Sequence, residues 1–209
     1  FFNPIYLRPE RIPEYAALPA AGRDAVDQLV AQLPPWLTTD DAVDRDAAWT
    51  AKRAALRIVH AAPRSAGREL DYAAYRRREG AALADFAAWN VLAEDHGSDA
   101  LEWPEELRRP DSPAVAAYVE EHADRIDFVC WMQWLLDEQL QQAQAKATNA
   151  GMAIGIVHDL AVGVHPGGAD AWRLPDVYAQ GVHVGAPPDP YNQQGQDWGL
   201  PPWRPDRLA

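Results

Sequence analysis

The sequence lacks most of the features expected of a secreted, membrane-bound or nucleic-acid-binding protein. Its 209 residues include one cysteine, Cys130, which lies in the apolar run FVCWMQWLL and has no partner for an internal disulfide. No apolar run reaches the roughly 20 residues that a membrane-spanning helix needs. Lys and Arg number 19 against 31 Asp and Glu, and the net charge of -12 would repel nucleic acid and anionic membranes. We therefore expect a cytoplasmic protein that binds neither nucleic acid nor membrane.

Most of the first 150 residues have the apolar spacing of amphipathic helices. Apolar residues recur at intervals of three and four, and prolines, glycines and capping residues separate the runs. The opening stretch FFNPIYLRP is instead expected to be an extended edge or a loop, because prolines interrupt it. Helices are expected over residues 25–33 (ended by Pro34 and Pro35), over residues 44–60, from near Asp71 to Gly97 (one helix or two, because Gly80 weakens the middle), after the Ser112-Pro113 cap, and from near Asp124 to Ala150, closed by Gly151.

An aromatic stripe in the last of these helices has the spacing of a buried helix face. Such a stripe packs against another helix or a sheet more often than it binds a ligand. The side chains that we expect in the core are Phe128, Trp131, Trp134 and Leu135.

The composition changes after Gly151. The last part of the chain holds nine of the 13 glycines and eight of the 18 prolines, and it has no long helical period. The run MAIGIVHDLAVGV, residues 152–164, begins as a strand that is apolar on both faces, which predicts a parallel strand covered on both sides. Asp159 falls near its C-terminal end, where barrels and doubly wound folds place their active sites. A carboxylate that only caps a loop fits Asp159 equally well.

Histidines in this part of the chain raise the possibility of a metal site. Imidazole and carboxylate groups suit zinc or iron, and the candidate ligands are His158, Asp159, His165 and His183. None of the familiar ligand spacings occurs among them, because the two histidines of HDLAVGVH are seven residues apart. The sequence therefore favours a site without metal.

The densest group of polar and aromatic side chains is the stretch GAPPDPYNQQGQDWGLPP, residues 185–202. Glucose presents apolar C–H faces edged by hydroxyl groups, so a site for it needs an exposed aromatic plane beside carboxylate and carboxamide groups. This stretch supplies that mixture, and its glycines permit tight turns. The residue types fit a sugar-binding loop, and they fit equally a proline-stiffened surface loop in which Trp198 only plugs the rim of a barrel.

Four stretches of the sequence together resemble the amylomaltases, which are 4-α-glucanotransferases. They are FFNPIYLRPE, FVCWMQWLLDEQL, HDLAVGVHPGGADAW and GVHVGAPPDPYNQQGQDWGLPPW. The resemblance implies a (β/α)8 TIM barrel with helical insertions, of which this chain is an internal, mostly α piece. It assigns residues 1–122 to a helical insertion subdomain, and residues 123–209 to a barrel helix, a barrel strand and a substrate-binding loop.

The resemblance also implies an activity. Enzymes of this kind break an α-1,4-glucosidic bond and pass the glucan to a 4-hydroxyl of another sugar, by a retaining double displacement between two carboxyl groups. They need no metal or organic cofactor, and their partners are maltooligosaccharides and α-1,4-glucans. The motifs of the nucleophilic Asp and the acid–base Glu are not found in these 209 residues, so no catalytic residue is expected in this chain.

Five residues match substrate-binding positions of the family. Asp159 matches the carboxylate that holds a glucose hydroxyl near the cleavage point. Gln196 and Trp198 match residues that line the acceptor side, with Trp198 as the stacking platform, and Asp189 matches the acidic residue of the loop. Some relatives carry an aromatic directly after PPD, whereas here a proline stands there and the aromatic is displaced to Tyr191.

Two other functions fit the same residues. A non-catalytic helical interaction module or carbohydrate-binding module could retain the loop by descent alone. A related α-glucan hydrolase would use water in place of the acceptor sugar. Only the family resemblance separates these functions from transfer.

Overall fold

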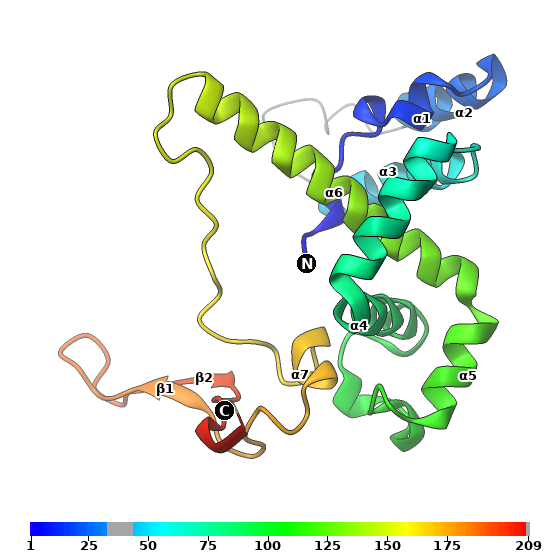
Figure 1. Ribbon diagram of the computed structural model, residues 1–209. Coiled ribbons are helices and arrows are strands. Elements are labelled where there is room, and N and C mark those ends of the chain that lie inside the picture. Colours follow the sequence, from blue (N-terminus) through cyan, green and yellow to red (C-terminus); the bar gives the residue numbers. More distant parts are fainter. Residues whose placement is uncertain (33–43, 208–209) are drawn as a thin grey trace. The chain divides into compact units, whose positions relative to one another are not determined.

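The computed structural model describes residues 1–32 and 44–207, and most of these residues are helical, as expected (Figure 1). None of the described helices is both long and apolar enough to span a membrane. The chain divides into two compact units. Unit 1 contains Phe1–Arg78 and Cys130–Ile156, and unit 2 contains Glu79–Val129 and Val157–Ala209.

Helix α3 (Arg45–His60) of unit 1 begins at a cap that the sequence marks. The helix starts after Asp44, whose carboxylate accepts hydrogen bonds from two N–H groups of the first turn at 3.0 and 2.9 Å. This confirms the helix predicted there. The prolines Pro34 and Pro35, expected to end the preceding helix, lie outside the described residues. The other elements of the unit are the 3-10 helices η1 (Pro4–Tyr6) and η2 (Pro9–Arg11), the helices α1 (Pro13–Ala16) and α2 (Ala20–Ala31), the first part of α4, and most of α6.

Helix α6 (Ala123–Asn149) supplies the centre of unit 1 from Cys130 onwards. Trp131, Trp134 and Leu135 are buried there, and Phe128 is buried in the part of α6 that belongs to unit 2. The predicted core stripe is therefore confirmed. Cys130 is also buried, as expected of a cysteine that acts as a small apolar residue.

Two glutamines of α6 hold the opening stretch of the chain. Gln133 accepts a hydrogen bond from the N–H of Phe2 at 2.9 Å and donates to its carbonyl at 2.8 Å. Gln139 makes the same pair of bonds with Arg8, at 3.0 and 3.1 Å. Each carboxamide thus bonds both backbone groups of one residue, as a neighbouring strand would. The stretch joins no sheet, and it contains the 3-10 helix η1 and the first residue of η2.

A buried ion pair ties the short helix α1 to α4 and α6. The guanidinium of Arg68 donates to Glu14 at 2.8 Å and to Glu138 at 2.6 Å, and it lies 4.0 Å from the centroid of the Trp134 ring. Glu14 is only 3% exposed. Burial disfavours the charge of Arg68, but the hydrogen bonds to the two carboxylates outweigh it and raise the pKa of Arg68 above its ordinary value.

Helix α4 (Ala66–His96) is interrupted where the sequence predicts weakness. Gly80 has φ 57° and ψ -137°, which is not helical, so two helical segments meet there. Gly97 follows the end of the helix with φ 92°, which confirms it as the closing residue. The predicted start near Asp71 is wrong. The helix begins at Ala66, after Ser65, whose carbonyl and hydroxyl both accept backbone hydrogen bonds from the first turn.

Unit 2 is packed around Trp103, which is buried. The rings of Trp89 and Trp172 each lie 6.1 Å from it, centroid to centroid. All three indole N–H groups donate to backbone carbonyls, at 2.8 to 3.1 Å, so the cluster buries no unpaired indole donor. The helices of the unit, besides parts of α4 and α6, are η4 (Ala100–Glu102), η5 (Glu105–Leu107), α5 (Pro113–Glu121) with the predicted Ser112 cap, α7 (Ala169–Arg173) and η6 (Pro205–Arg207).

The predicted strand over residues 152–164 is not formed. These residues have no strand hydrogen bonds, and Leu160 is 93% exposed, so the prediction of a strand covered on both faces is wrong for the described chain. The yellow segment of Figure 1 accordingly carries no arrow. A parallel strand needs neighbours on both sides and helices over its faces. The described residues contain one sheet, a two-stranded one, which residues 152–164 do not join.

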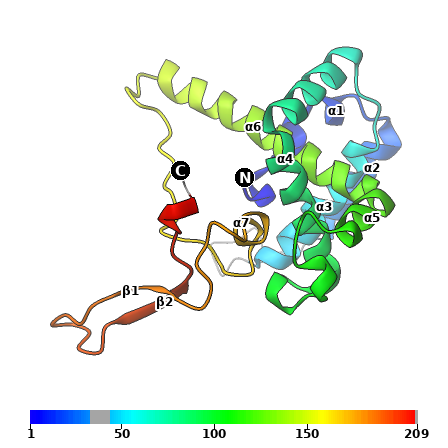
Figure 2. The same cartoon turned by 60° about the horizontal axis from the view of Figure 1, so that its bottom comes forward.

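That sheet is an antiparallel hairpin of β1 (Val184–Ala186) and β2 (Gln196–Leu200). Figures 1 and 2 both show it as a two-stranded arm with its loop at the end. At its base the rings of Tyr178 and Trp203 lie 4.6 Å apart, and the N–H of Ala179 donates to the Pro202 carbonyl at 2.9 Å. The base of the hairpin is thus fixed by both side-chain and backbone contacts.

Candidate functional site

The β1–β2 hairpin carries four of the five predicted substrate-binding residues, and an irregularity in its pairing shapes it. Val184 pairs with Leu200, but the next residue of β1, Gly185, pairs with Asp197. Trp198 and Gly199 therefore form a bulge in β2. A bulge changes the direction of the strand and of the side chains on it, and Gly199 has the positive φ of 65° that such a bend requires.

The side chains of Gln196 and Trp198 are joined. The indole N–H of Trp198 donates to the carboxamide oxygen of Gln196 at 3.0 Å, and Trp198 is 41% exposed. The carboxamide thus holds one edge of the indole while part of the ring remains open to solvent. An aromatic plane next to a carboxamide that can still donate its N–H groups suits a sugar ring and its hydroxyls.

Asp189 organises the loop between the strands. Its Oδ1 accepts hydrogen bonds from the N–H groups of Tyr191 and Asn192, both at 2.7 Å, and its own N–H donates to the Asn192 carbonyl at 3.0 Å. One carboxylate oxygen is therefore used to fix the turn, which the sequence pattern does not reveal. Tyr191 is 99% exposed at this turn, so its ring is fully available to a ligand. Gly195, with φ 74°, closes the loop against the Ala186 carbonyl.

A contact that the sequence does not predict lies beside Trp198. The Nδ1 atom of His183 is 3.0 and 3.1 Å from the two carboxylate oxygens of Asp197, and Oδ1 also accepts from the N–H of Gly199 at 2.8 Å. The hydrogen bond from His183 has the largest effect on the pKa of Asp197, and the one from Gly199 acts in the same direction. Both lower this pKa below its ordinary value. His183 and Asp197 could be predicted as a pair only if the register of the two strands were known. That register is set by the bulge, which the sequence does not show.

Asp159 lies in the exposed segment that precedes the hairpin. Its side chain is exposed, and no hydrogen bond or ion pair among the described residues joins it to the hairpin. Further along the segment the chain approaches β2 closely, since a Cβ atom added to Gly163 would lie 2.9 Å from Cδ1 of Leu200. The structure thus brings the segment of Asp159 to the hairpin, without a contact from Asp159 itself.

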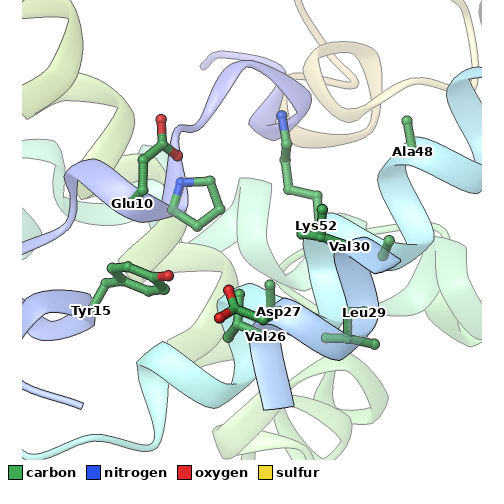
Figure 3. A pocket seen from close by; sticks show the side chains of 11 residues that line it. Glu10, Tyr15, Val26, Asp27, Leu29, Val30, Ala48 and Lys52 are labelled. Atoms are coloured by element: carbon green, nitrogen blue, oxygen red, sulfur yellow. The ribbon is translucent and has the colours of Figure 1, made fainter. Parts of the chain in front are cut away.

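A pocket of about 280 Å³ in unit 1 has a different character (Figure 3). It is lined mainly by apolar side chains, and its polar and aromatic lining residues are Glu10, Tyr15, Asp27 and Lys52. Burial lowers the pKa of Lys52 despite the opposing effect of Glu10, and its ammonium donates to the backbone carbonyl of Ile5. No carboxamide of the described residues lines the pocket, which distinguishes it from the β1–β2 hairpin.

The four residues considered as metal ligands do not meet. His183 is bonded to Asp197, and the Nδ1 of His165 accepts from the N–H of Gly167 at 3.1 Å. His158 and Asp159 lie in the exposed segment. Over residues 1–32 and 44–207, no three His, Cys, Asp or Glu side chains are grouped as ligands of a metal ion.

Comparison with known sequences identifies one family over the whole chain. The profile of glycoside hydrolase family 77, described as 4-alpha-glucanotransferase, matches residues 1–209. The 4-alpha-glucanotransferase of Mycobacterium tuberculosis (strain ATCC 25618 / H37Rv) is 60% identical over 209 residues, which are all of this chain and 29% of that protein. The enzyme of the same name from Haemophilus influenzae is 36% identical over 146 residues, 66% of this chain and 21% of the relative. The chain thus spans less than a third of the length of these relatives.

Solved structures agree with the sequence comparison. The crystal structure of amylomaltase from Corynebacterium glutamicum matches all of this chain and 28% of that one, with a TM-score of 0.82 and 44% identity. The amylomaltase from Streptococcus agalactiae in complex with acarbose matches 87% of this chain and 40% of that one, with a TM-score of 0.68 and 19% identity, which supports the fold alone. With the family profile matched from end to end, the chain belongs to the 4-alpha-glucanotransferases of glycoside hydrolase family 77.

Proposed function

We propose that this chain is the acceptor-binding part of a 4-α-glucanotransferase, which transfers α-1,4-glucan segments to a sugar 4-hydroxyl by retaining double displacement. Its partners are maltooligosaccharides and α-1,4-glucans. Family membership over the whole chain supports this activity. The observation that carries the acceptor role is the partly exposed indole of Trp198, held at a bulge by the carboxamide of Gln196.

The five predicted residues have separate roles in this proposal. Trp198 is the plane on which an acceptor glucose stacks, and Gln196 and Tyr191 contact the sugar from β2 and from the loop. Asp189 fixes the turn through Oδ1 and offers its other carboxylate oxygen to a hydroxyl. Asp159 holds a glucose hydroxyl near the cleavage point, which requires its exposed segment to settle against the rest of the enzyme.

The domain arrangement is part of the same proposal. Residues 1–122 form a helical insertion of a (β/α)8 barrel, and residues 123–209 supply a barrel helix, a barrel strand and the substrate-binding loop. Residues 152–164 are apolar and exposed, so they suit a place in the sheet of a full-length barrel, between strands that lie outside this chain. A cytoplasmic location is supported by the single buried cysteine.

An acceptor site gives the hairpin a mechanistic task. After the first displacement the glucan is bound covalently to the nucleophilic carboxylate, and either water or a sugar hydroxyl can release it. A sugar at millimolar concentration competes with water only if it is held in position and water is partly excluded. A stacked ring on Trp198 achieves both, and this favours transfer over the hydrolase alternative. The two catalytic carboxyl groups come from outside the 209 residues.

The test uses the purified 209-residue chain, with its helix content first verified by circular dichroism. We expect no disproportionation of maltotriose, because the catalytic carboxyl groups are missing. Calorimetric titration with maltotetraose should show weak binding that Trp198→Ala weakens about fivefold. The exposed Leu70→Ala variant is the control on unit 1 and should bind as the unchanged chain does. Detectable turnover would contradict the assignment of the catalytic groups. Absence of binding by a folded chain would favour a non-catalytic helical module.

A further inference from the structure

The bulge of β2 needs an explanation, because nothing in the proposed binding of sugar accounts for the contacts that hold it. Trp198 and Gly199 stand between Asp197 and Leu200, which pair with consecutive residues of β1. A shift of one residue in a strand pairing turns its side chains to the opposite face. The direction of the Trp198 ring therefore depends on the bulge staying at this one place.

The carboxylate of Asp197 bonds both sides of the bulge. Oδ1 accepts from the N–H of Gly199, the second bulge residue, at 2.8 Å. Across the hairpin, His183 directs Nδ1 to both carboxylate oxygens, at 3.0 and 3.1 Å. His183 is the residue just before β1, so the carboxylate links the beginning of one strand to the bulge of the other. This carboxylate is ionised at neutral pH even with its ordinary pKa, and the hydrogen bond from His183 lowers the pKa further.

The close approach of the two backbones adds a second constraint. A Cβ atom at Gly185, the partner of Asp197, would overlap the carbonyl oxygen of Gln196. The two backbones therefore approach closely at the pair Gly185–Asp197, and Asp197 is also the residue that bonds His183. Gln196 and Asp197 pair regularly with consecutive residues of β1, and the register shifts directly after Asp197.

We propose that His183 and Asp197 are positioning residues of the transfer reaction, which hold the β2 bulge and so direct the ring of Trp198 towards the acceptor sugar. This inference rests on the proposed function of Trp198. Neither residue needs to touch the sugar. Their effect passes through the backbone of residues 197–199, so they act on the acceptor step more than on cleavage of the donor.

Substitutions at His183 distinguish a directed hydrogen bond from a structural role. His183→Asn places an amide N–H near the position of Nδ1, whereas His183→Gln places it near that of Nε2. In the full-length protein we expect His183→Ala and His183→Gln to lower the ratio of transfer to hydrolysis about threefold to fivefold. Loss of one net hydrogen bond has an effect of this size, and it does not exceed the effect of removing the Trp198 ring itself. His183→Asn should restore most of the ratio. Asp197→Ala, which also loses the hydrogen bond from the N–H of Gly199, should lower the ratio at least as far as His183→Ala and raise the KM for acceptor glucose.

A double variant separates failure of this inference from failure of the proposed function. If the bridge acts through Trp198, then adding Asp197→Ala to Trp198→Ala should lower the ratio no further. A ratio that falls in Trp198→Ala but not in Asp197→Ala or His183→Ala would overturn the inference and leave the proposed function standing. Equal losses in His183→Asn and His183→Gln would also overturn it. An unchanged ratio in Trp198→Ala would instead remove the proposed acceptor platform itself.

Discussion

Replacing Trp198 by alanine removes the exposed plane on which we place the acceptor sugar. The ring is 41% exposed, and among the described residues its Nε1 donates to the carboxamide of Gln196, so the substitution deletes the exposed platform together with this hydrogen bond. An aromatic stacking contact contributes about 1 kcal/mol, which corresponds to about a fivefold change in an equilibrium or rate. We expect Trp198→Ala to lower the ratio of transfer to hydrolysis by about fivefold, because only transfer needs a bound acceptor.

The assay measures transfer to a sugar and hydrolysis by water in the same reaction, because both begin from the same glycosyl-enzyme. Full-length protein is given maltotriose with labelled glucose as acceptor, so that label in longer sugars measures transfer and new reducing ends measure hydrolysis. Trp198→Phe is the matched control, because it keeps an aromatic plane and loses only the N–H bond to Gln196. Its ratio should lie close to that of the unchanged protein. A Trp198→Ala ratio equal to that of the unchanged protein would refute the stacking argument.

Three further substitutions test other parts of the structure. Gly185→Ala introduces a methyl group against the opposite strand, so the hairpin should shift its register, and the transfer-to-hydrolysis ratio should fall while helix content by circular dichroism stays constant. Glu14→Gln removes one of the two carboxylates that pair with Arg68 in a buried site, and it should reduce the free energy of unfolding by about 2 kcal/mol in denaturant melts. An unchanged free energy of unfolding would show that this ion pair does not stabilise the fold. Ser112→Ala removes the cap of α5 and should reduce the same free energy by about 1 kcal/mol, whereas the same change at the exposed Ser98 should have almost no effect.

Local signals in the sequence were sufficient for most of the helical structure. The caps at Asp44 and Ser112 and the closing glycine Gly97 act within one turn of the chain, so their effect can be predicted without tertiary contacts. The start of α4 was misplaced because the apolar stripe begins later than the helix. Ser65 caps a first turn that is largely exposed, and hydrophobic periodicity does not mark such a turn.

The sheet and the site depend on partners distant in the sequence, and there the sequence was less informative. Residues 152–164 have the composition of a buried strand, but a strand forms only where neighbours accept its hydrogen bonds, and the described chain supplies none. The residue types from Asp189 to Trp198 are visible in the sequence, and they predict a sugar-binding loop. The bulge and the bridge from His183 to Asp197 were not, because a register is a relation between two strands.

The central claim is that the β1–β2 hairpin binds the acceptor glucan and that cleavage is carried out by groups outside this chain. A crystal structure of the full-length protein with a bound maltooligosaccharide tests it most directly. We expect a glucose ring stacked on the indole of Trp198, within van der Waals distance of about 4 Å, with a hydroxyl hydrogen-bonded to Gln196. Sugar rings bound in the enzyme with none of them against the hairpin would contradict it.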